Sequence, residues 1–279
     1  MHDIGLDSRS AATARHAFRR VSRLPFGQVV VAIISAGFLA TPLRVEAQIT
    51  TKVSVATGGA PAQGEVLGYK PAVSADGRVI AFTSYAANLV PGDTNDSLDV
   101  FVHDRHTGVT TRVSVASDGT QGNSDSEAPA LSADGRYVAF ESAASTLVPG
   151  DTNGAIDVFV HDRVTGTTSR ESVATDGAQT GGASRSPSLS VDGRVVAFSS
   201  SSNTLDAGDS DINGVPDIFV RERSTGTTTR VSATPDGVQH QSSSDAPLLS
   251  ANGHLVLYQS WGTGVFLHDR NAGTTTRVI

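Results

Sequence analysis

An internal repeat with a period of about 58 residues constrains this chain more than any other feature. One segment recurs four times, as VSADGRVIAFTS (73–84), LSADGRYVAFES (131–142), LSVDGRVVAFSS (189–200) and LSANGHLVLYQS (249–260). A second segment follows each copy, at residues 99–115, 157–173, 217–233 and 265–279. A fixed period of this kind is typical of folds in which each unit buries its apolar faces only against its neighbours. We therefore expect four similar units.

Each unit has the pattern of short strands joined by tight turns. Runs rich in Val, Phe and Ala alternate with Ser-x-Asp-Gly and Asp-Arg-x-Thr-Gly turns, which suit hairpins. In the first unit the strands are expected at PAVS, RVIAFTS, DVFVHD and TTRVSV, and no helical periodicity of useful length follows residue 48. Four antiparallel strands per unit predict an all-β fold, a β-propeller of four or five four-stranded blades.

These repeats resemble those of TolB-type, WD-like propellers. The family's unit runs Pro-x-x-Ser-Pro-Asp-Gly-Arg, an Ile-Ala-Phe strand, an Asp-Ile-Tyr-Val strand and a Thr-Gly turn. The first unit matches it at Pro71, Ser74, Asp76, Gly77, Arg78, Ala81, Phe82, Asp99, Phe101, Val102, Thr107 and Gly108. The resemblance covers residues 49–279 and implies the propeller fold. Because the separate N-terminal domain of TolB has no counterpart here, binding to TolB's lipoprotein partner is not implied.

The strand count leaves ring closure open. The propeller is expected over residues 48–279, with units at about 70–127, 128–185, 186–245 and 246–279. The stretch ITTKVSVAT (49–57) looks like one further outer strand, which would give five outer strands for four sets of the other three. Either the ring closes with a supernumerary strand, or the array is open and its edge strands seek a partner, including another copy of the chain.

The first 47 residues have the pattern of a secretory signal. Five arginines lie within residues 1–28, and an apolar run follows from Val29 to Ala40. A membrane-spanning helix needs about 20 residues, so this run is better suited to the apolar helix of a signal peptide, with cleavage after Ala47. We expect the mature chain to be periplasmic or secreted and without a membrane span. A buried or membrane-anchoring helix is the alternative.

Charge and cysteine content exclude several classes of function. The chain has 21 basic and 28 acidic residues, a net charge of −7, and the charge of residues 48–279 is more negative still because six arginines and three acids precede them. An acidic surface repels phosphate backbones, so nucleic-acid binding is not expected. With no cysteine there is no disulfide and no thiolate metal site.

Residues that recur in every unit are best explained as scaffold. His103, His161 and His268 occupy one position, which holds Arg221 in the third unit. The aspartates of the Ser-x-Asp-Gly turns, Asp76, Asp134 and Asp192, are expected to accept hydrogen bonds from nearby turn amides. No serine lies in the Gly-x-Ser-x-Gly context of a hydrolase nucleophile.

One acidic loop has the spacing of a calcium site. In GDSDINGVPDIFV (208–220), side chains at loop positions 1, 3, 5 and 9 and the carbonyl at position 7 offer the alternating oxygens that calcium prefers. These ligands are Asp209, Asp211, Asn213, Asp217 and the carbonyl of Val215. The spacing resembles integrin-type propeller loops and the start of an EF-hand loop. The alternative is a turn whose carboxylates cap backbone amides.

Two shorter loops give weaker calcium candidates, and the fourth unit has no such loop. The candidates are Asp151, Asn153 and Asp157 in the second unit and Asp93, Asn95 and Asp99 in the first.

The sequence as a whole favours an exported, non-enzymatic propeller that binds a protein or glycan partner, with calcium as a structural ion. Two alternatives remain: a propeller enzyme such as a polysaccharide lyase or hydrolase, and a spacer fragment of a larger surface protein. A ligand site at a propeller mouth needs residues that break the repeat. Residues of this kind are Tyr258, Gln259, Trp261, Tyr69, Glu65, His240 and Gln241. Residues of this kind are more often packing substitutions between blades.

Overall fold

The computed structural model describes residues 50–206, 213–236 and 238–279, which contain sixteen β-strands and no helix. Within these ranges no segment meets the length and apolarity of a membrane-crossing helix. The expected signal peptide at residues 1–47, its helix and the cleavage position near Ala47 lie outside the described residues.

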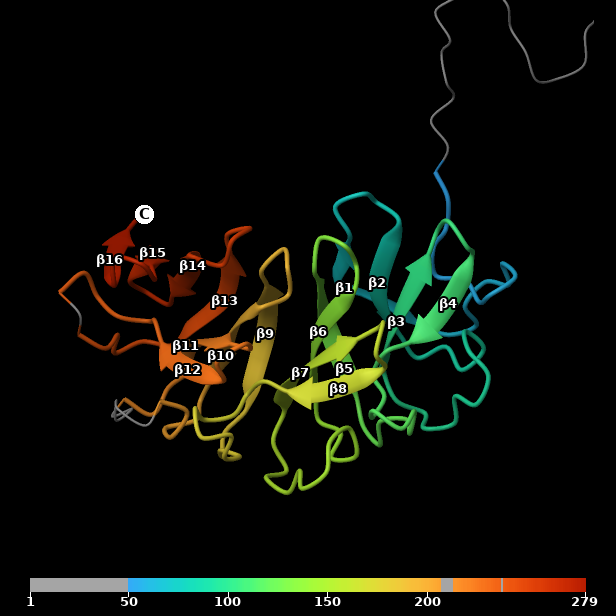
Figure 1. Cartoon of the computed structure of the whole chain (residues 1–279), viewed down its shortest axis with the longest axis horizontal. Coiled ribbons are helices and arrows are strands. Elements are labelled where there is room, and N and C mark those ends of the chain that lie inside the picture. The colour runs from blue at the N-terminus through green and yellow to red at the C-terminus, as the bar shows by residue number, and fades with distance from the viewer. Residues whose placement is uncertain (1–49, 207–212, 237) are drawn as a thin grey trace, which may run out of the picture. The chain divides into compact units, whose positions relative to one another are not determined.

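The strands form four separate four-stranded antiparallel sheets, each with its strands in chain order (Figure 1). Blade 1 holds β1 (Val66–Val73), β2 (Val79–Ser84), β3 (Asp99–Asp104) and β4 (Val109–Arg112); blade 2 holds β5 (Ser126–Leu131), β6 (Tyr137–Ser142), β7 (Asp157–Asp162) and β8 (Thr167–Arg170); blade 3 holds β9 (Ser184–Leu189), β10 (Val195–Ser200), β11 (Asp217–Glu222) and β12 (Thr227–Arg230); blade 4 holds β13 (Ser244–Leu249), β14 (Leu255–Ser260), β15 (Gly264–Asp269) and β16 (Thr274–Arg277). The predicted all-β propeller blades are confirmed.

The first strand of each blade begins earlier than the repeat suggested, because it contains a bulge. The pairing of β5 with β6 shifts between Glu127 and Ala130, and Ala128 at the shift has a φ of 53°. Equivalent residues with positive φ are Lys70, Ser186 and Ala246, and each of the four precedes a proline. A bulge inserts an unpaired residue and breaks the alternation that marks a strand in sequence. The predicted boundaries near residues 70, 128, 186 and 246 therefore fall inside the observed strands.

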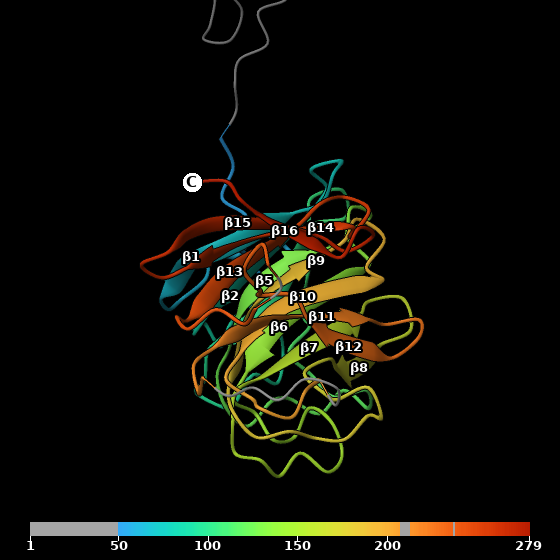
Figure 2. The same cartoon turned by 90° about the vertical axis from the view of Figure 1, so that its left-hand side faces the viewer.

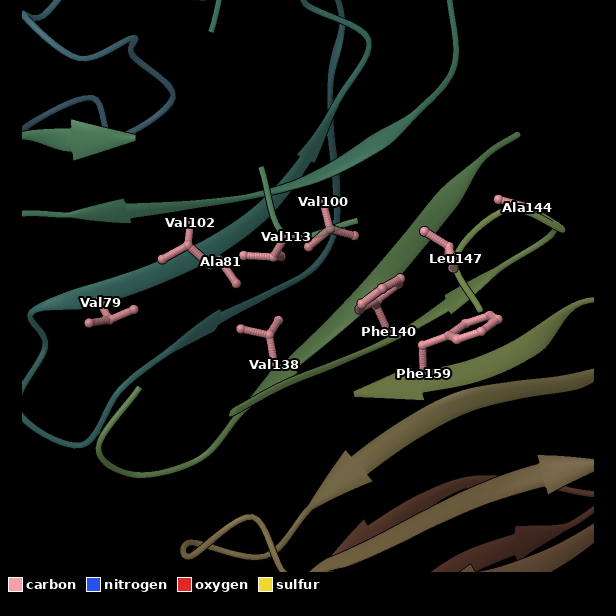
Figure 3. Packing of buried hydrophobic residues seen from close by; sticks show 10 residues of the cluster. All are labelled: Val79, Ala81, Val100, Val102, Val113, Val138, Phe140, Ala144, Leu147 and Phe159. Carbon is pink, nitrogen blue, oxygen red and sulfur yellow. The ribbon is translucent and has the colours of Figure 1, made fainter. Parts of the chain in front are cut away.

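Successive blades bury their apolar faces against each other. Between blades 1 and 2 the core holds Val79, Ala81, Val100, Val102 and Val113 from blade 1 and Val138, Phe140, Ala144, Leu147 and Phe159 from blade 2 (Figure 3). Two further cores join blade 2 to blade 3 and blade 3 to blade 4. Burying each large side chain contributes roughly 1.5–3 kcal/mol, so the stacking of blades supplies the apolar core that a single sheet lacks.

The stretch before blade 1 is an irregular connection. An outer strand was expected at 49–57, but the described part of this range, residues 50–57, contains no strand. Val55 forms an isolated bridge to Pro61, and the Thr57 hydroxyl accepts a hydrogen bond from the Thr110 amide on β4 at 2.9 Å. The same contact recurs between Ser117 and Thr168. Each connection thus fastens onto the outer strand of the blade that follows it, without adding a strand.

Blade order follows chain order throughout. The first strands contact one another in sequence, β1 with β5, β5 with β9 and β9 with β13. Among the described residues, blade 4 has no comparable packing on blade 1. Figure 2 gives the view from the side of blade 4. Of the two alternatives predicted for ring closure, the described residues therefore form the open array.

Candidate functional site

The Ser-x-Asp-Gly turns hold themselves together through their own aspartates. Asp134 Oδ1 accepts hydrogen bonds from Ser132 Oγ at 2.6 Å and from the Arg136 amide at 2.9 Å. Asp76 and Asp192 make the same contacts in blades 1 and 3. The serine hydrogen bond holds the pKa of Asp76 and of Asp192 below its usual range. The expected turn-capping role is confirmed.

The repeated histidines brace the two outer strands of their blades. The Nδ1 atoms of His103 and His161 each lie 2.9 Å from the hydroxyl of a threonine on the next strand, Thr110 and Thr168. His268 and Thr275 are 3.0 Å apart in blade 4. Burial lowers the pKa of all three imidazoles. These contacts support the scaffold role predicted for the position.

The buried histidines predict a loss of stability in mild acid. The pKa of such a histidine is lower in the folded state than its unfolded value of about 6.5. The unfolded state therefore binds protons more readily as the pH falls, and the free energy of unfolding decreases below pH 6.5. We expect the melting temperature to fall between pH 7 and pH 5, and to fall less in His161→Gln. Thermal melts monitored by circular dichroism across this range measure both slopes. Parallel slopes for the two proteins would contradict this assignment.

The acidic loop of blade 2 surrounds an arginine. Arg170 Nη1 lies 3.0 Å from Asp151 Oδ1 and 3.4 Å from Asp157 Oδ2. Asp157 is buried and also accepts hydrogen bonds from Ser172 Oγ at 2.6 Å and Asn153 Nδ2 at 2.9 Å. Burial raises the pKa of Asp151. The three weaker calcium candidates of this loop are thus brought together, with a guanidinium between the two carboxylates.

Blade 1 repeats this arrangement. Arg112 Nη1 lies 3.0 Å from Asp93 and 3.2 Å from Asp99, and Asn95 Nδ2 donates to Asp99 at 3.1 Å. In both short loops the asparagine offers its nitrogen to the carboxylate, whereas calcium takes oxygen ligands. A calcium ion in either loop would have to displace the arginine and turn the amide.

In the third loop the structure describes only part of the predicted ligand set. Asp209 and Asp211 lie outside the described residues. Asn213 Oδ1 accepts the Val215 amide at 2.9 Å, and the buried carboxylate of Asp217 accepts hydrogen bonds from Ser232 at 2.6 Å and Gln239 at 2.8 Å. No group of three or more His, Asp or Glu able to hold a metal is found within residues 50–206, 213–236 and 238–279.

Residues that break the repeat converge between blades 2 and 3. Tyr137 replaces the Val or Leu of the other blades, Glu171 replaces Val, and Arg221 replaces His. All three line one groove of about 600 Å³. The groove is lined by Asp134, Arg136, Tyr137, Ser169, Arg170, Glu171, Asp192, Gly193, Arg194, Arg221, Arg223 and Ser224. We call this feature the arginine groove.

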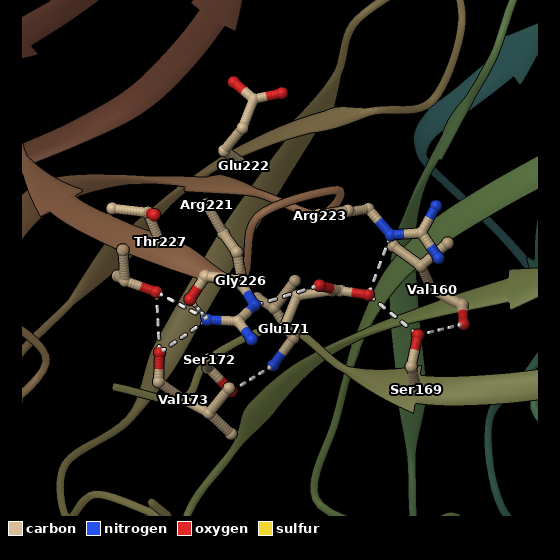
Figure 4. Close-up of polar contacts among 12 residues, drawn as sticks. Val160, Ser169, Glu171, Ser172, Val173, Arg221, Glu222, Arg223, Gly226 and Thr227 are labelled. Atoms are coloured by element: carbon tan, nitrogen blue, oxygen red, sulfur yellow. Dashed lines mark hydrogen bonds and ion pairs between the residues drawn. The ribbon is translucent and has the colours of Figure 1, made fainter. Parts of the chain in front are cut away.

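A buried glutamate anchors two of its arginines. Glu171 is 4% exposed and accepts hydrogen bonds from Arg223 Nε at 2.9 Å and Ser169 Oγ at 2.7 Å, and it forms an ion pair with Arg221 Nε at 3.3 Å (Figure 4). Arg221 also donates from Nη1 to Thr228 Oγ1 at 2.9 Å. Charge-assisted hydrogen bonds of this kind are stronger than neutral ones. Glu171 therefore fixes both guanidinium groups before any ligand arrives.

Two guanidinium groups lie against the ring of Tyr137, one of them that of Arg223. The Cζ atoms of Arg136 and Arg223 lie 4.8 and 4.9 Å from the ring centroid. Arg136 is paired with Asp162 at 2.7 Å, and Arg223 donates to the Gly193 carbonyl at 2.9 Å. Each cation–π contact contributes roughly 0.5–1 kcal/mol at a site open to solvent, so the groove wall is ordered by several weak contacts acting together.

The arginine groove is a basic site on an acidic protein. Five arginines and three acidic residues line it. Asp134 and Asp192 cap their own turns, Glu171 pairs with Arg221 and Arg223, and Arg194, whose side chain is 74% exposed, lies 3.6 Å from Asp192. Guanidinium groups recognise carboxylates through paired hydrogen bonds.

Sequence reasoning missed this site and favoured other residues. Tyr258 is 1% exposed, donates to the Ala233 carbonyl at 3.0 Å and packs on His240 and Phe266, so it belongs to a core between blades. Trp261 is 59% exposed. The alternative that these residues are packing substitutions is confirmed for Tyr258. The signal for the arginine groove was departure from the repeat at Glu171 and Tyr137.

No family model and no curated protein matches the chain. Similar solved structures include TolB from Acinetobacter baumannii, with 20% identity, a TM-score of 0.46 and coverage of 77% of this chain and 43% of that one. Putative TolB from Agrobacterium tumefaciens has 16% identity, a TM-score of 0.48 and coverage of 77% and 62%. Oligogalacturonate lyase from Vibrio parahaemolyticus has 10% identity, a TM-score of 0.47 and coverage of 77% and 53%. The chain spans about half the length of these structures, and a likeness of this degree does not extend to function.

Proposed function

We propose that this chain is an exported, non-enzymatic binding scaffold, and that the arginine groove receives a carboxylate-rich segment of a protein partner. The observation that carries this proposal is convergence: the residues that depart from the repeat at Tyr137, Glu171 and Arg221 meet in one groove. A residue shared by all blades is explained by the scaffold, whereas these three departures meet at one place. There Glu171 pairs with Arg221 and holds guanidinium groups beside the groove, where they could bind a carboxylate.

Fixed guanidinium groups favour binding over chemistry. Glu171 accepts three contacts from Ser169, Arg221 and Arg223, which leaves it poorly placed to accept a proton from a substrate. Because Arg221 and Arg223 are already ordered, little side-chain entropy is lost when a carboxylate binds. The exposed Arg194 at the rim can approach an acidic segment that enters the groove.

A charge reversal at the rim tests the proposal. Hexaglutamate labelled with a fluorophore serves as the probe, and anisotropy measures its binding at low salt. Arg194→Glu is expected to weaken binding at least tenfold, about 1.4 kcal/mol, because an attractive charge becomes a repulsive one. Binding by the unchanged protein should decline as salt is added.

The matched control is Lys52→Glu, the same charge change at an exposed residue that does not line the groove. It is expected to change the affinity less than twofold. Equal weakening by the two variants, or no hexaglutamate binding at low salt, would refute the role of the groove.

Calcium is a second part of the proposed function, restricted to the third loop. Its support is the ligand spacing of Asp209, Asp211, Asn213, Val215 and Asp217. A bound ion stabilises the folded state by mass action, by about 2.7 kcal/mol when free calcium is one hundred times the dissociation constant. We expect the melting temperature to rise with calcium and to return with a chelator, and Asp211→Ala to abolish the response. An undiminished response in Asp211→Ala would exclude this loop.

A further inference from the structure

The three internal blade interfaces are built to one plan. Each combines apolar residues at one set of repeat positions in the earlier blade with apolar residues at a different set of positions in the later blade. Between blades 1 and 2 the earlier set is Val79, Ala81, Val100, Val102 and Val113, and the later set is Val138, Phe140, Ala144, Leu147 and Phe159. A blade therefore has two distinct faces, which we call the leading face (earlier set) and the trailing face (later set).

Among the described residues, the leading face of blade 4 and the trailing face of blade 1 have no blade packed against them. By repeat position the leading set of blade 4 is Leu255, Leu257, Val265, Leu267 and Val278, and the trailing set of blade 1 is Ile80, Phe82, Ala86, Leu89 and Phe101. Leu255 and Leu257 are half-buried, whereas their equivalents in blade 1, Val79 and Ala81, are 4% and 0% exposed. On blade 1, Ile80 is likewise half-buried, whereas the rest of the trailing set is 4% exposed or less and packs with Ala62, Val66 and Val90 of the same chain. Both end faces carry the apolar residues of an interface.

Apolar residues that flank these two sets are also more exposed than their equivalents at the internal interfaces. Val73 of blade 1 is 61% exposed, whereas its equivalents Leu131, Leu189 and Leu249 pack against the preceding blade. Leu248 of blade 4 is also 61% exposed. Large apolar side chains with this exposure at both ends indicate surfaces that pair with something.

Backbone hydrogen bonds also form a ladder from blade to blade. The Ala75 amide donates to the Ala133 carbonyl at 2.8 Å, Ala133 donates to Val191 at 2.8 Å, and Val191 donates to Ala251 at 2.9 Å. Within the described residues the ladder ends with the Ala75 carbonyl on blade 1 and the Ala251 amide on blade 4. One is an acceptor and the other a donor, so each supplies what the other lacks.

Charges at the two ends are complementary as well. At two of the three internal interfaces, an arginine of the later blade meets an acid of the earlier blade: Arg270 lies 3.0 Å from Glu222, and Arg223 lies 2.9 Å from Glu171. The equivalent of Arg270 on blade 1 is Arg105, which is exposed. The equivalent of Glu222 on blade 4 is Asp269.

We propose that a second copy of this chain covers both faces, with blade 4 of each copy packed on blade 1 of the other. The occupant is argued from complementarity of apolar sets, backbone ladder and charge, each of which repeats an interface already present in the chain. Propellers typically close with four to eight blades, and within the part of the chain that the structure describes, blade 4 does not pack on blade 1 as neighbouring blades do. Two copies give a closed ring of eight blades with no exposed end, and this assembly does not depend on the proposed ligand of the arginine groove.

Molecular mass in solution tests this assembly directly. Sedimentation equilibrium of the full chain at micromolar concentration is expected to give twice the mass of one copy. Leu257→Arg on the leading face and Ile80→Arg on the trailing face should each give single copies with unchanged circular dichroism. Val164→Arg, at a residue 73% exposed in the turn after β7, is the control and should stay dimeric. Arg105→Asp, a surface change, should weaken the dimer at least tenfold and keeps the test valid if an apolar-face variant fails to fold.

Mixing the two variants identifies the head-to-tail arrangement. Leu257→Arg retains an intact blade 1 face and Ile80→Arg an intact blade 4 face, so one of the two contacts can re-form between them. We expect the mixture to contain dimers weaker than the unchanged protein's. A single-copy mass for the unchanged chain, a dimer unaffected by both apolar-face variants and by Arg105→Asp, or two soluble variants that do not associate would overturn the proposal.

Discussion

Replacing Asp157 with alanine is expected to lower the free energy of unfolding by about 3–5 kcal/mol, the range for removing one partner of a buried ion pair. Asp157 is 1% exposed, and its carboxylate accepts hydrogen bonds from Ser172 at 2.6 Å and Asn153 at 2.9 Å, with Arg170 at 3.4 Å. Without it these donors lose their acceptor inside the blade. Chemical denaturation monitored by circular dichroism measures the change.

The matched control is Asp176→Ala, which removes an exposed aspartate whose one described contact is the Ala178 amide at 2.9 Å. It should cost about 1 kcal/mol or less, since a single solvent-exposed turn contact is lost. A second variant, Asp157→Ala with Arg170→Leu, is not expected to recover the loss, because it leaves the buried carboxylate of Asp151 without the arginine that lies 3.0 Å from it. Equal costs for Asp157→Ala and Asp176→Ala would show that the Asp–Arg cluster does not hold the blade.

The repeat made the strands and turns predictable, because each blade is stabilised by local features that recur. Three copies of the Ser-x-Asp-Gly turn and one Ser-x-Asn-Gly copy indicate hairpins wherever they occur, and Asp134 and its equivalents hold those turns as predicted. The bulges were not predictable in the same way. Ala128 has a positive φ before a proline, which neither an alanine nor a residue before proline favours. The sequence pattern therefore places this bulge residue in the connection before the strand.

The candidate sites were predictable only where their residues lie close together in the sequence. Sequence spacing identified the acidic residues of the loops, because ligand spacing is local. The arginine that neutralises them was not identified, since Arg170 lies on β8, an outer strand that only folding brings against Asp151. The arginine groove was missed for the same reason: Glu171 and Tyr137 are read as ordinary strand residues until the blades pack.

The turn glycines give the sharpest test of packing between blades. A Cβ added to Gly135 would lie 2.7 Å from the Cβ of Val79 on the preceding blade, whereas one added to Gly77 would have its nearest neighbour, Arg105 Nη1, at 3.9 Å. Both glycines have a φ near 70°. Gly77→Ala is expected to cost about 1–2 kcal/mol from the left-handed backbone alone, and Gly135→Ala about 1–3 kcal/mol more because Val79 is branched at Cβ and cannot turn away.

This comparison is best made in the Leu257→Arg background. In the proposed dimer, Gly77 of one copy would face Leu255 of the other, as Gly253 faces Val195 within the chain, where an added Cβ would lie 2.8 Å from Val195 Cγ2. With the copies separated, Gly77→Ala reports backbone strain alone and the extra cost of Gly135→Ala reports the contact between blades. In the unchanged protein, Gly77→Ala should additionally weaken the dimer. If both substitutions lowered the free energy of unfolding equally in denaturation experiments, the blades would not be held at the observed separation. The internal interfaces would then no longer support the proposed contact between copies.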